Sequence, residues 1–344
     1  MAARKHVGIG IWGAGWVAGA HAAAYKSTPS CKIVAIGSRR RESAADLARI
    51  QGLDSRIYAD YADFLSDPDL DAVSICTPNG LHPQNAIEGA QAGKHLFIEK
   101  PVALKPEDLA KMLAAADAAG IVTAVGFVSR GNPLVQRMRK IVQSGALGEI
   151  YMIGADYWHT RVGRPDYYKT AEEAGSAYMV GGVHAVDAVR FITGLDVVAV
   201  CSASTQIGSA AAEGYQMHAA DALLVKYSNG AVGRVSAAIH GHMPYQLNLD
   251  ILGDDGIIQN NRLFTRDNAK GDPFTILDEE GPDSGNVDDH AFPYLMAHFL
   301  ECIAASSETS ISLENSVNTH EIGFAADISK RLGEWVTLPL PEFS

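Results

Sequence analysis

A short apolar run followed at once by closely spaced glycines constrains the fold of this chain most. Residues 7–12 read Val-Gly-Ile-Gly-Ile-Trp, and residues 13–18, Gly-Ala-Gly-Trp-Val-Ala, match the pattern G-x-G-x-x-G/A. The alanine-rich stretch Val17–Lys26 comes next and predicts a helix. A strand, a tight glycine turn and a helix in this order are typical of a unit that binds a dinucleotide.

Each position of this motif has a physical role. Gly13 permits the tight turn, Gly15 lets the backbone approach a pyrophosphate, and the small Ala18 lets helix and strand pack closely. The first N–H groups of the helix, at Trp16 and Val17, carry partial positive charge and suit a phosphate group. We therefore expect Gly13, Gly15, Trp16 and Val17 to contact a cofactor. A glycine-rich turn without a ligand is the alternative.

Strand and helix signals alternate through the first 125 residues. After the first strand, the expected strands are 32–37, 72–76, 95–98 and 122–127, and the expected helices are 42–50, 83–92 and 106–119. Such alternation implies a parallel sheet with helices on both faces. Right-handed crossovers then give a doubly wound α/β fold of the Rossmann type, with its ligand crevice at the carboxyl ends of the strands.

The pattern changes after about residue 128. Helices are expected at 134–144, 177–192, 294–305 and 317–335, and strands at 150–157, 197–205, 222–227, 231–239 and 245–252. Ser228-Asn229-Gly230 between two of these strands predicts a hairpin. The sequence thus predicts a dinucleotide-binding domain over residues 1–125. An α+β domain with an open, mostly antiparallel sheet is expected over residues 126–344, and its C-terminal helix can pack back on the first domain.

Composition narrows the range of partners. The formal net charge is −12 and no long basic run exists, which disfavours nucleic acid and anionic membranes. No apolar stretch approaches the ~18 residues that cross a bilayer, and the glycines come too early for a secretory signal. The four cysteines lack the spacing of a zinc or redox motif. We expect a cytoplasmic protein whose partner is a small molecule.

The end of the second predicted strand bears on the choice of cofactor. Proteins that bind NAD usually carry an Asp or Glu here, which holds the ribose hydroxyls. This chain has Ser38-Arg39-Arg40-Arg41 instead. A hydroxyl and a guanidinium bind a 2′-phosphate through charge-assisted hydrogen bonds. We therefore expect Ser38 and Arg39 to favour NADP(H), with NAD(H) possible, while Arg40 and Arg41 also fit a solvated basic helix start.

Further motifs resemble those of a known family. They are Thr77-Pro78-Asn79-Gly80-Leu81-His82, Glu99-Lys100-Pro101, the G-F-x-x-R-x-N-P segment Gly126–Pro133 and the G-x-H-x-x-D segment Gly182–Asp187. With the N-terminal glycines, they resemble the glucose–fructose oxidoreductase / inositol dehydrogenase (Gfo/Idh/MocA) family over nearly the whole chain. The resemblance implies a nicotinamide dinucleotide cofactor and hydride transfer at a carbon of a sugar or cyclitol. It also implies a homo-oligomer, a dimer or tetramer, formed through the open sheet.

The resemblance assigns roles to the residues of these motifs. Glu99 is expected near the nicotinamide ribose. Lys100 is expected at the cofactor and facing the reacting substrate hydroxyl, held by Pro101, which in relatives often follows a cis bond. The residues expected to border the cofactor ribose and diphosphate are Thr77, Pro78 and Asn79, with His82 close by.

The chemistry of alcohol oxidation indicates which residues act on the substrate. When a hydride leaves a secondary alcohol, the hydroxyl proton must leave as well, so a general acid/base must lie within hydrogen-bond reach. A lysine desolvated beside a cationic nicotinamide ring loses its proton more readily, and Lys100 fits this role. A surface lysine in a loop is the alternative.

A second pair of candidates lies on one face of a predicted helix. His184 and Asp187 are three residues apart. We expect His184 to bind the substrate or relay its proton, and Asp187 to orient the groups on the substrate side. Sugar and inositol dehydrogenases of the family commonly carry an Asp four residues before this histidine. Here that residue is Val180, so we expect Lys100 to carry more of the proton transfer.

The substrate itself is expected to meet the segments Tyr157–Arg161 and Arg164–Lys169. Aromatic rings stack on the C–H faces of sugars, and His or Lys binds hydroxyl groups. Tyr157, His159 and Lys169 are the preferred contacts, and a polar loop that closes the sheet edge is the alternative. No metal site is expected, because the pair His240 and His242 lacks a supporting carboxylate motif.

Three functions fit these features. The leading hypothesis is an NADP(H)-dependent dehydrogenase or reductase of a sugar, cyclitol or sugar derivative. A glycosidase that retains its dinucleotide, and uses transient oxidation to eliminate an aglycone, is the alternative. A catalytically silent dinucleotide sensor is disfavoured by the presence of both Lys100 and His184.

Overall fold

The chain forms two compact units. The computed structural model describes residues 6–160, 169–208, 214–269, 271–282 and 290–344. The first unit comprises residues 1–126 and 291–317, and the second comprises residues 127–290 and 318–344. None of the described helices combines the length and the apolar character of a bilayer-spanning segment.

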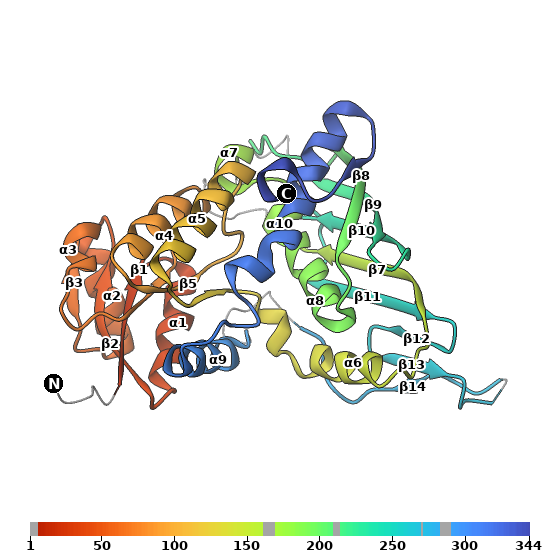
Figure 1. Ribbon diagram of the computed structural model, residues 1–344, viewed down its shortest axis with the longest axis horizontal. Coiled ribbons are helices and arrows are strands. Elements are labelled where there is room, and N and C mark those ends of the chain that lie inside the picture. The colour runs from red at the N-terminus through yellow and green to blue at the C-terminus, as the bar shows by residue number, and fades with distance from the viewer. Residues whose placement is uncertain (1–5, 161–168, 209–213, 270, 283–289) are drawn as a thin grey trace. The chain divides into compact units, whose positions relative to one another are not determined.

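The first unit is built on a six-stranded parallel sheet (Figure 1). Its strand order is β3-β2-β1-β4-β5-β6. The order reverses between β1 and β4, which places a ligand crevice at the carboxyl ends of these strands. The doubly wound fold is confirmed. The strands are β1 (Val7–Trp12), β2 (Cys31–Gly37), β3 (Arg56–Tyr58), β4 (Ala72–Ile75), β5 (His95–Ile98) and β6 (Thr123–Val125).

Helices complete the first unit. They are α1 (Trp16–Lys26), α2 (Arg41–Gln51), α3 (Tyr61–Leu65), α4 (His82–Gln91), α5 (Pro106–Ala119) and α9 (Phe292–Ala305). Although α9 is remote in sequence, it packs beside α1 (Figure 1), where the His21 and Phe292 ring centroids lie 4.4 Å apart. The short elements β3 and α3 were not expected, because three to five residues carry too little periodicity for a prediction.

The second unit is built on a nine-stranded sheet of order β14-β13-β12-β11-β7-β10-β9-β8-β15. Among the described strands only β7 and β10 pair in parallel, so the mostly antiparallel sheet is confirmed. The short strands at its two edges were not expected from the sequence. The strands are β7 (Ile150–Trp158), β8 (Val197–Thr205), β9 (Ala220–Tyr227), β10 (Val232–Ala238), β11 (Gln246–Gly253), β12 (Gly256–Gln259), β13 (Arg262–Thr265), β14 (Thr275–Ile276) and β15 (Val336–Thr337).

The predicted hairpin joins β9 to β10. Gly230 has a φ of 91°, which the absence of a Cβ permits. The Tyr227 N–H donates to the Ala231 carbonyl at 2.9 Å and closes the turn. The strands on either side pair antiparallel from Lys226 and Val232 onward.

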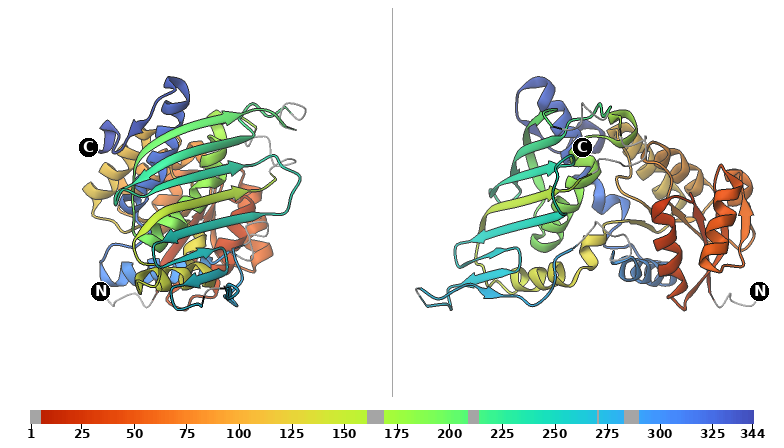
Figure 2. Two further views of the ribbon diagram at one scale, coloured as in Figure 1. Left: turned by 90° about the vertical axis from the view of Figure 1, so that its right-hand side faces the viewer. Right: turned by 180° about the vertical axis from the view of Figure 1, so that it is seen from behind.

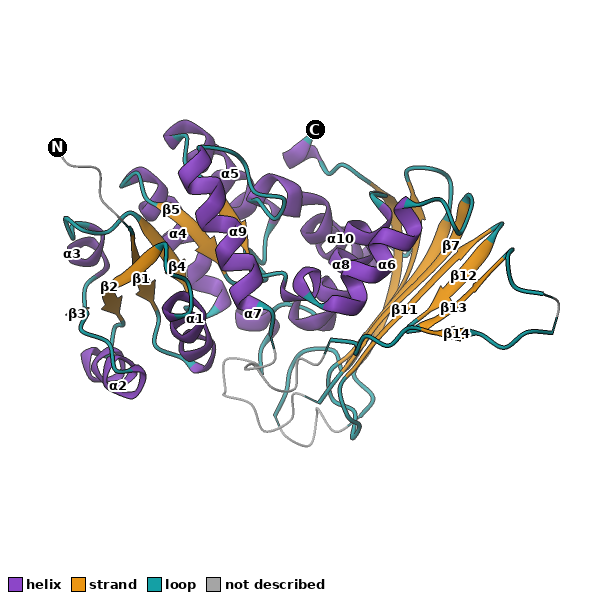
Figure 3. Ribbon diagram, turned by 90° about the horizontal axis from the view of Figure 1, so that it is seen from below, coloured by secondary structure: helices purple, strands orange, loops and turns teal. Residues whose placement is uncertain are grey.

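The two faces of the nine-stranded sheet differ. The helices of the second unit include α6 (Pro133–Gln143), α7 (Ala171–Ala174) and α8 (Val183–Thr193), and α10 (Leu313–Leu332) runs on from the first unit. Figure 3 shows α6 and α8 on one side of the sheet, where α8 contacts β7 and β11. The opposite face, which no described helix of this unit covers, is seen in Figure 2 (left). Met152, Leu224 and Val232 lie on it with 42%, 58% and 53% of their surface exposed.

The predicted helix over residues 177–192 consists of two pieces. Tyr178–Gly182 forms a π-helical turn, and α8 follows from Val183. A Cβ on Gly181 would overlap the Tyr157 ring, and a Cβ on Gly182 would lie 2.9 Å from the Tyr178 ring. The two glycines therefore let aromatic rings from the sheet and the helix pack directly against this backbone.

Replacement of Gly181 by alanine tests this packing. Because the new methyl group would occupy the place of the Tyr157 ring, Gly181→Ala should lower the free energy of unfolding by about 1–3 kcal/mol. Urea unfolding measures the effect. The matched control is Gly281→Ala, where the nearest atom, Cδ2 of Leu134, is at an ordinary contact distance of 3.8 Å. Equal stability of the two variants would show that the ring does not rest on Gly181.

Candidate active site

The glycine turn after β1 lies against the end of β4. Gly13 has a φ of 103°, and its N–H donates to the Gly37 carbonyl at 2.8 Å. A Cβ at Gly13 would lie 2.5 Å from the Cys76 carbonyl oxygen. Only glycine therefore allows this turn to approach the neighbouring strand so closely.

The start of α1 fits a phosphate group. Gly15 is the N-cap residue, and no described side chain caps the helix. Apart from the neighbours of Gly15 in the chain, none of the described residues has an atom within 4 Å of a Cβ built on Gly15. Trp16 is 51% exposed and Val17 is half-buried. The helix thus presents its first N–H groups and the positive end of its dipole beside open space. This geometry suits the pyrophosphate of a dinucleotide.

The basic residues after β2 separate into two kinds. Arg41 donates from Nη1 to the Ile57 carbonyl at 2.8 Å, which ties it to β3. Ser38 is half-buried, and its backbone N–H donates to the Tyr58 carbonyl at 3.1 Å. Arg39 and Arg40 are exposed at the carboxyl end of the strand. Arg39 can therefore serve an anionic ligand, whereas Arg41 serves the fold.

The loop after β4 is held by a hydrogen bond to α4. The Thr77 hydroxyl donates to Oδ1 of Asn85 at 3.1 Å, and the Asn85 carbonyl accepts from the Tyr61 hydroxyl at 2.8 Å. Pro78 precedes a 3₁₀ turn over Asn79–Leu81, in which Asn79 is buried. Thr77, Pro78 and Asn79 thus lie at the same sheet edge as the glycine turn.

Glu99 takes part in a buried series of side-chain contacts that was not predicted from the sequence. Nε2 of His21 lies 2.9 Å from Oε1 of Glu99, and Nδ1 of His21 lies 2.7 Å from the Ser74 hydroxyl. His21 and Ser74 are fully buried. A Cβ on Gly126 would lie 2.6 Å from Oε1 of Glu99, so this glycine makes room for the carboxylate. A single histidine within an alanine-rich helix is the sequence signal for this chain of contacts.

Lys100 and His82 belong to the same edge. Lys100 is half-buried, and the Lys100–Pro101 peptide bond is cis, as the family resemblance implies. His82 is the first residue of α4, and both of its ring nitrogens face backbone carbonyl oxygens. The described edge of the first sheet therefore brings together the cofactor-side residues expected from the sequence.

His184 lies in the second unit at the start of α8. It is buried, and its ring is nearly parallel to that of Tyr157, with the centroids 6.0 Å apart. Val180 is buried in the preceding π-helical turn. π-Helical turns are uncommon and often occur at functional sites. His184 is thus held on an irregular helix start, beside an aromatic ring from β7.

Further ring contacts involve Tyr157 and the residues just after β7. Tyr245 lies 5.4 Å from Tyr157 and 5.5 Å from His159, measured between ring centroids. Thr160 forms an isolated bridge with His240, whose ring lies 4.6 Å from that of Tyr215. We call Tyr157, His159, His184 and Tyr245 the aromatic cluster. The described residues contain no group of three or more metal-binding side chains.

The remaining substrate-side candidates lie outside this cluster or outside the described residues. Lys169 is half-buried, and its carbonyl accepts from the Gln216 N–H at 2.7 Å. Arg161 and Arg164–Tyr168 lie outside the described residues.

Asp187 is engaged by a residue that sequence reasoning missed. Arg130 donates from Nε and Nη2 to the two carboxylate oxygens of Asp187 at 2.7 and 2.6 Å. Both side chains are buried, and the guanidinium lies over the rings of Phe127 and Phe191. Such a bidentate pair fixes the face of α8 that also carries His184. The position of Arg130 in the G-F-x-x-R-x-N-P segment is the sequence signal.

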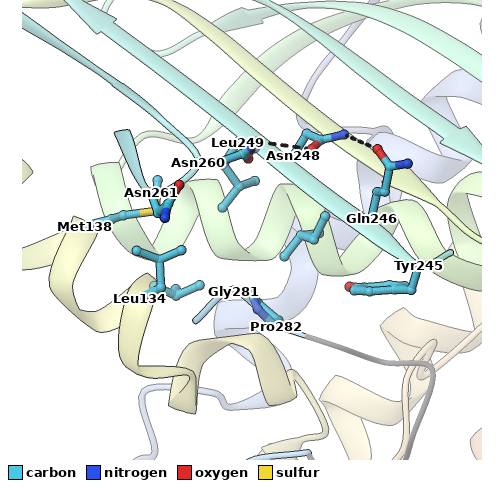
Figure 4. Close-up of a pocket in the computed structure, with 12 residues that line it drawn as sticks. Leu134, Met138, Tyr245, Gln246, Asn248, Leu249, Asn260, Asn261, Gly281 and Pro282 are labelled. Carbon is cyan, nitrogen blue, oxygen red and sulfur yellow. Dashed lines mark hydrogen bonds between the residues drawn. The ribbon is translucent and has the colours of Figure 1, made fainter. Parts of the chain in front are cut away.

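A cavity of about 360 Å³ adjoins the aromatic cluster at Tyr245 (Figure 4). Leu134, Val135 and Met138 of α6 form one wall, and β11 forms the other. Asn260 and Asn261 lie at the far end from Tyr245. The cavity is of a size that holds a small ligand or part of one.

The Arg130–Asp187 pair predicts a large loss of stability on truncation. Asp187→Ala would leave a buried guanidinium without its carboxylate, and should cost about 3–5 kcal/mol in the free energy of unfolding. Asp46→Ala, which breaks the exposed Arg49–Asp46 pair, is the control and should cost no more than about 1 kcal/mol. If Asp187→Ala unfolds like the wild type and loses only substrate affinity, Asp187 binds substrate directly and does not support the fold.

Comparison with known proteins agrees with this architecture. The model of the oxidoreductase family with an NAD-binding Rossmann fold, GFO_IDH_MocA, matches residues 7–127, and that of the GFO/IDH/MocA C-terminal domain matches residues 135–259. The scyllo-inositol 2-dehydrogenase (NAD(+)) of Bacillus subtilis is 26% identical over 91% of this chain and 90% of its own. The levoglucosan dehydrogenase of Pseudarthrobacter phenanthrenivorans is 28% identical over 75% of this chain and 74% of its own.

A solved structure extends the comparison to three dimensions. Levoglucosan dehydrogenase in complex with NADH superposes with a TM-score of 0.88 and 25% identity, over 97% of this chain and 100% of that chain. This chain therefore shares its fold with a dehydrogenase that binds NADH. The chain belongs to the Gfo/Idh/MocA family of NAD(P)-dependent oxidoreductases, which includes sugar and inositol dehydrogenases.

Proposed function

We propose that this oxidoreductase acts on a CH–OH group of a sugar, a cyclitol or a sugar derivative. The observation that carries the proposal is the convergence, at one sheet edge, of the Gly13 turn, the open start of α1 and the segment Glu99–Pro101. When bound, the nicotinamide supplies the hydride acceptor or donor. The names of relatives support the substrate class, since they include dehydrogenases of inositol, levoglucosan and D-glucosides.

Lys100 is the residue that moves the substrate proton in this proposal. Lys100 is half-buried, and Glu99 precedes it in the chain. In the oxidation direction the neutral amine accepts the hydroxyl proton, and in the reduction direction the ammonium returns it to the oxygen. Glu99, which His21 orients, holds the ribose that carries the nicotinamide ring.

The second unit contributes the groups that recognise the substrate. In the proposal His184 donates or accepts a hydrogen bond at a substrate oxygen, and Tyr157 and His159 contribute ring faces and polar edges. Lys169 binds a substrate hydroxyl or acidic group. Asp187 acts through the scaffold, because Arg130 already occupies both of its carboxylate oxygens.

NADP(H) is the cofactor that the first unit favours in this proposal. The end of β2 carries the hydroxyl of Ser38 and the exposed guanidinium of Arg39 where a ribose-binding carboxylate commonly stands. Solved relatives hold NADH. The ratio of the two cofactor affinities therefore decides the question.

The assembly and the compartment are part of the same proposal. The uncovered sheet face carries the exposed apolar side chains Met152, Leu224 and Val232, which a second copy of the chain would bury. We propose a dimer or tetramer through this face. All four cysteines are free thiols, which supports a reducing compartment such as the cytoplasm.

A second function is favoured by the cavity next to Tyr245. Its apolar wall of Leu134, Val135 and Met138 suits a substituent on a sugar, and a glycosidase that retains its dinucleotide would bind an aglycone there. Purified enzyme with NADP and a sugar panel separates the two functions. A dehydrogenase changes the absorbance of the nicotinamide, whereas a glycosidase releases the aglycone without net change in the cofactor.

The choice of cofactor is tested at Arg39. Arg39→Ala removes a charge-assisted hydrogen bond to the 2′-phosphate and should weaken NADP binding by about 1.5–3 kcal/mol while sparing NAD. Fluorescence titration with both reduced cofactors gives the two affinities. Arg41→Ala serves as the control, because Arg41 is bound to the Ile57 carbonyl and should not change the preference. An equal loss for both cofactors would remove Arg39 from 2′-phosphate recognition.

The division of proton transfer is tested at Lys100 and His184. Lys100→Ala should lower kcat by roughly 10²–10⁴-fold, the contribution of a positioned acid/base, with cofactor affinity retained. His184→Ala should cost less, because Val180 stands where a carboxylate partner is usual. Lys105→Ala, at an exposed position just before α5, is the control. If His184→Ala proves the more damaging variant, His184 is the primary base.

A further inference from the structure

His82 spans two loops at the carboxyl edge of the first sheet. It is 1% exposed. Nδ1 lies 2.8 Å from the Pro101 carbonyl oxygen, and Nε2 lies 2.8 Å from the Thr77 carbonyl oxygen. Thr77 belongs to the loop after β4, and Pro101 follows Lys100 in the turn after β5. One buried ring thus connects a loop on the cofactor side to the segment that carries Lys100.

The chemistry of imidazole limits what this ring can do. A neutral imidazole carries one N–H, and both facing groups are acceptors, so the neutral ring can donate to only one of them. Burial lowers the pKa of His82, and the two carbonyls oppose this shift. Among charged side chains, Glu99 raises the pKa of His82 and Lys100 lowers it. Because burial is the largest of these influences, the neutral ring with a single donor is favoured.

The two carbonyls differ in how the chain already restrains them. Thr77 is five residues from His82 and is joined to it through the 3₁₀ turn at the start of α4. Pro101 is 19 residues away, in the segment 99–105, which is neither helix nor strand. Within that segment, the Glu99 N–H is anchored to the Ile75 carbonyl at 3.2 Å. A hydrogen bond to Pro101 therefore restrains backbone that regular secondary structure leaves unrestrained.

We propose that His82 is a positioning residue whose Nδ1–H donates to the Pro101 carbonyl and thereby fixes the backbone that carries Lys100. The inference rests on the proposed function of Lys100 at the substrate oxygen. His82 acts through the turn and touches neither substrate nor reacting atoms. Its loss therefore lowers kcat more than it changes KM or the affinity for the dinucleotide.

Three substitutions separate the two contacts of the ring. An asparagine amide replaces the donor at Nδ1, a glutamine amide replaces the donor at Nε2, and phenylalanine keeps the ring shape with no donor. We expect His82→Phe and His82→Gln to lower kcat by roughly 10–100-fold, the effect of a small misplacement of an acid/base. His82→Asn should retain most of the wild-type kcat. Gln84→Ala, at an exposed position of the same helix, should match the wild type.

A measurement without turnover tests the contact directly. The ¹⁵N chemical shifts of His82 in the wild-type protein identify which ring nitrogen is protonated. A proton on Nδ1, in the neutral or the doubly protonated ring, supports the proposal. A neutral ring protonated only at Nε2 overturns it, because His82 then holds Thr77 alone. Equal kcat for all three variants overturns it as well.

Lys100→Ala, assayed on the same substrate, separates this inference from the proposed function. If Lys100→Ala is inactive and His82→Phe retains wild-type kcat, the positioning role fails while the function of Lys100 stands. If Lys100→Ala is active, the proposed function fails, and a positioning role in catalysis fails with it. If Lys100→Ala is inactive and only His82→Asn among the three variants is active, both are supported.

Discussion

The parallel pairing of β1 with β4 is the constraint on which the cofactor side of the molecule depends. Ile9 to Trp12 pair in register with Ala72 to Ile75, and the Cys76 N–H continues the ladder to the Trp12 carbonyl at 2.8 Å. The chain can turn away from this ladder only because Gly13 has no side chain to meet the Cys76 carbonyl. That turn places the start of α1 at the carboxyl edge of the sheet, and the loops after β4 and β5 lie at the same edge.

Buried polar contacts then fix the individual side chains. Glu99 is held by His21, the Pro101 carbonyl faces His82, and Asp187 is held by Arg130. A buried polar group that loses its partner costs about 1–3 kcal/mol, and more when it is charged. Each of these contacts therefore strongly favours the one arrangement of the side chains in which both partners are paired. Such contacts keep the geometry of these residues fixed before a ligand arrives.

The fold that this chain shares with its relatives does not by itself name the substrate. Relatives that share this fold carry the names of inositol, levoglucosan and glucoside dehydrogenases, so the fold does not select among polyols. In the second unit, the aromatic cluster and the cavity beside Tyr245 are the described features with which a polyol could be distinguished. Ring faces recognise C–H surfaces, whereas the apolar wall on α6 accepts a substituent.

The sequence by itself determined the doubly wound first sheet, the mostly antiparallel second sheet and the family, because strand–helix alternation, the glycine turn and the hairpin at Gly230 are local signals. The sequence also predicts that the motif residues from Gly13 to Pro101 lie at one edge of the first sheet, because parallel strands end at the same edge. Short elements such as β3 and β15 escaped prediction because a few residues show no period. Only the tertiary structure decided the partners of the motif residues. His21 contacts Glu99, which is 78 residues away in the chain, and Arg130 contacts Asp187, which is 57 residues away. No local sequence pattern encodes such contacts, because they form only when distant segments pack.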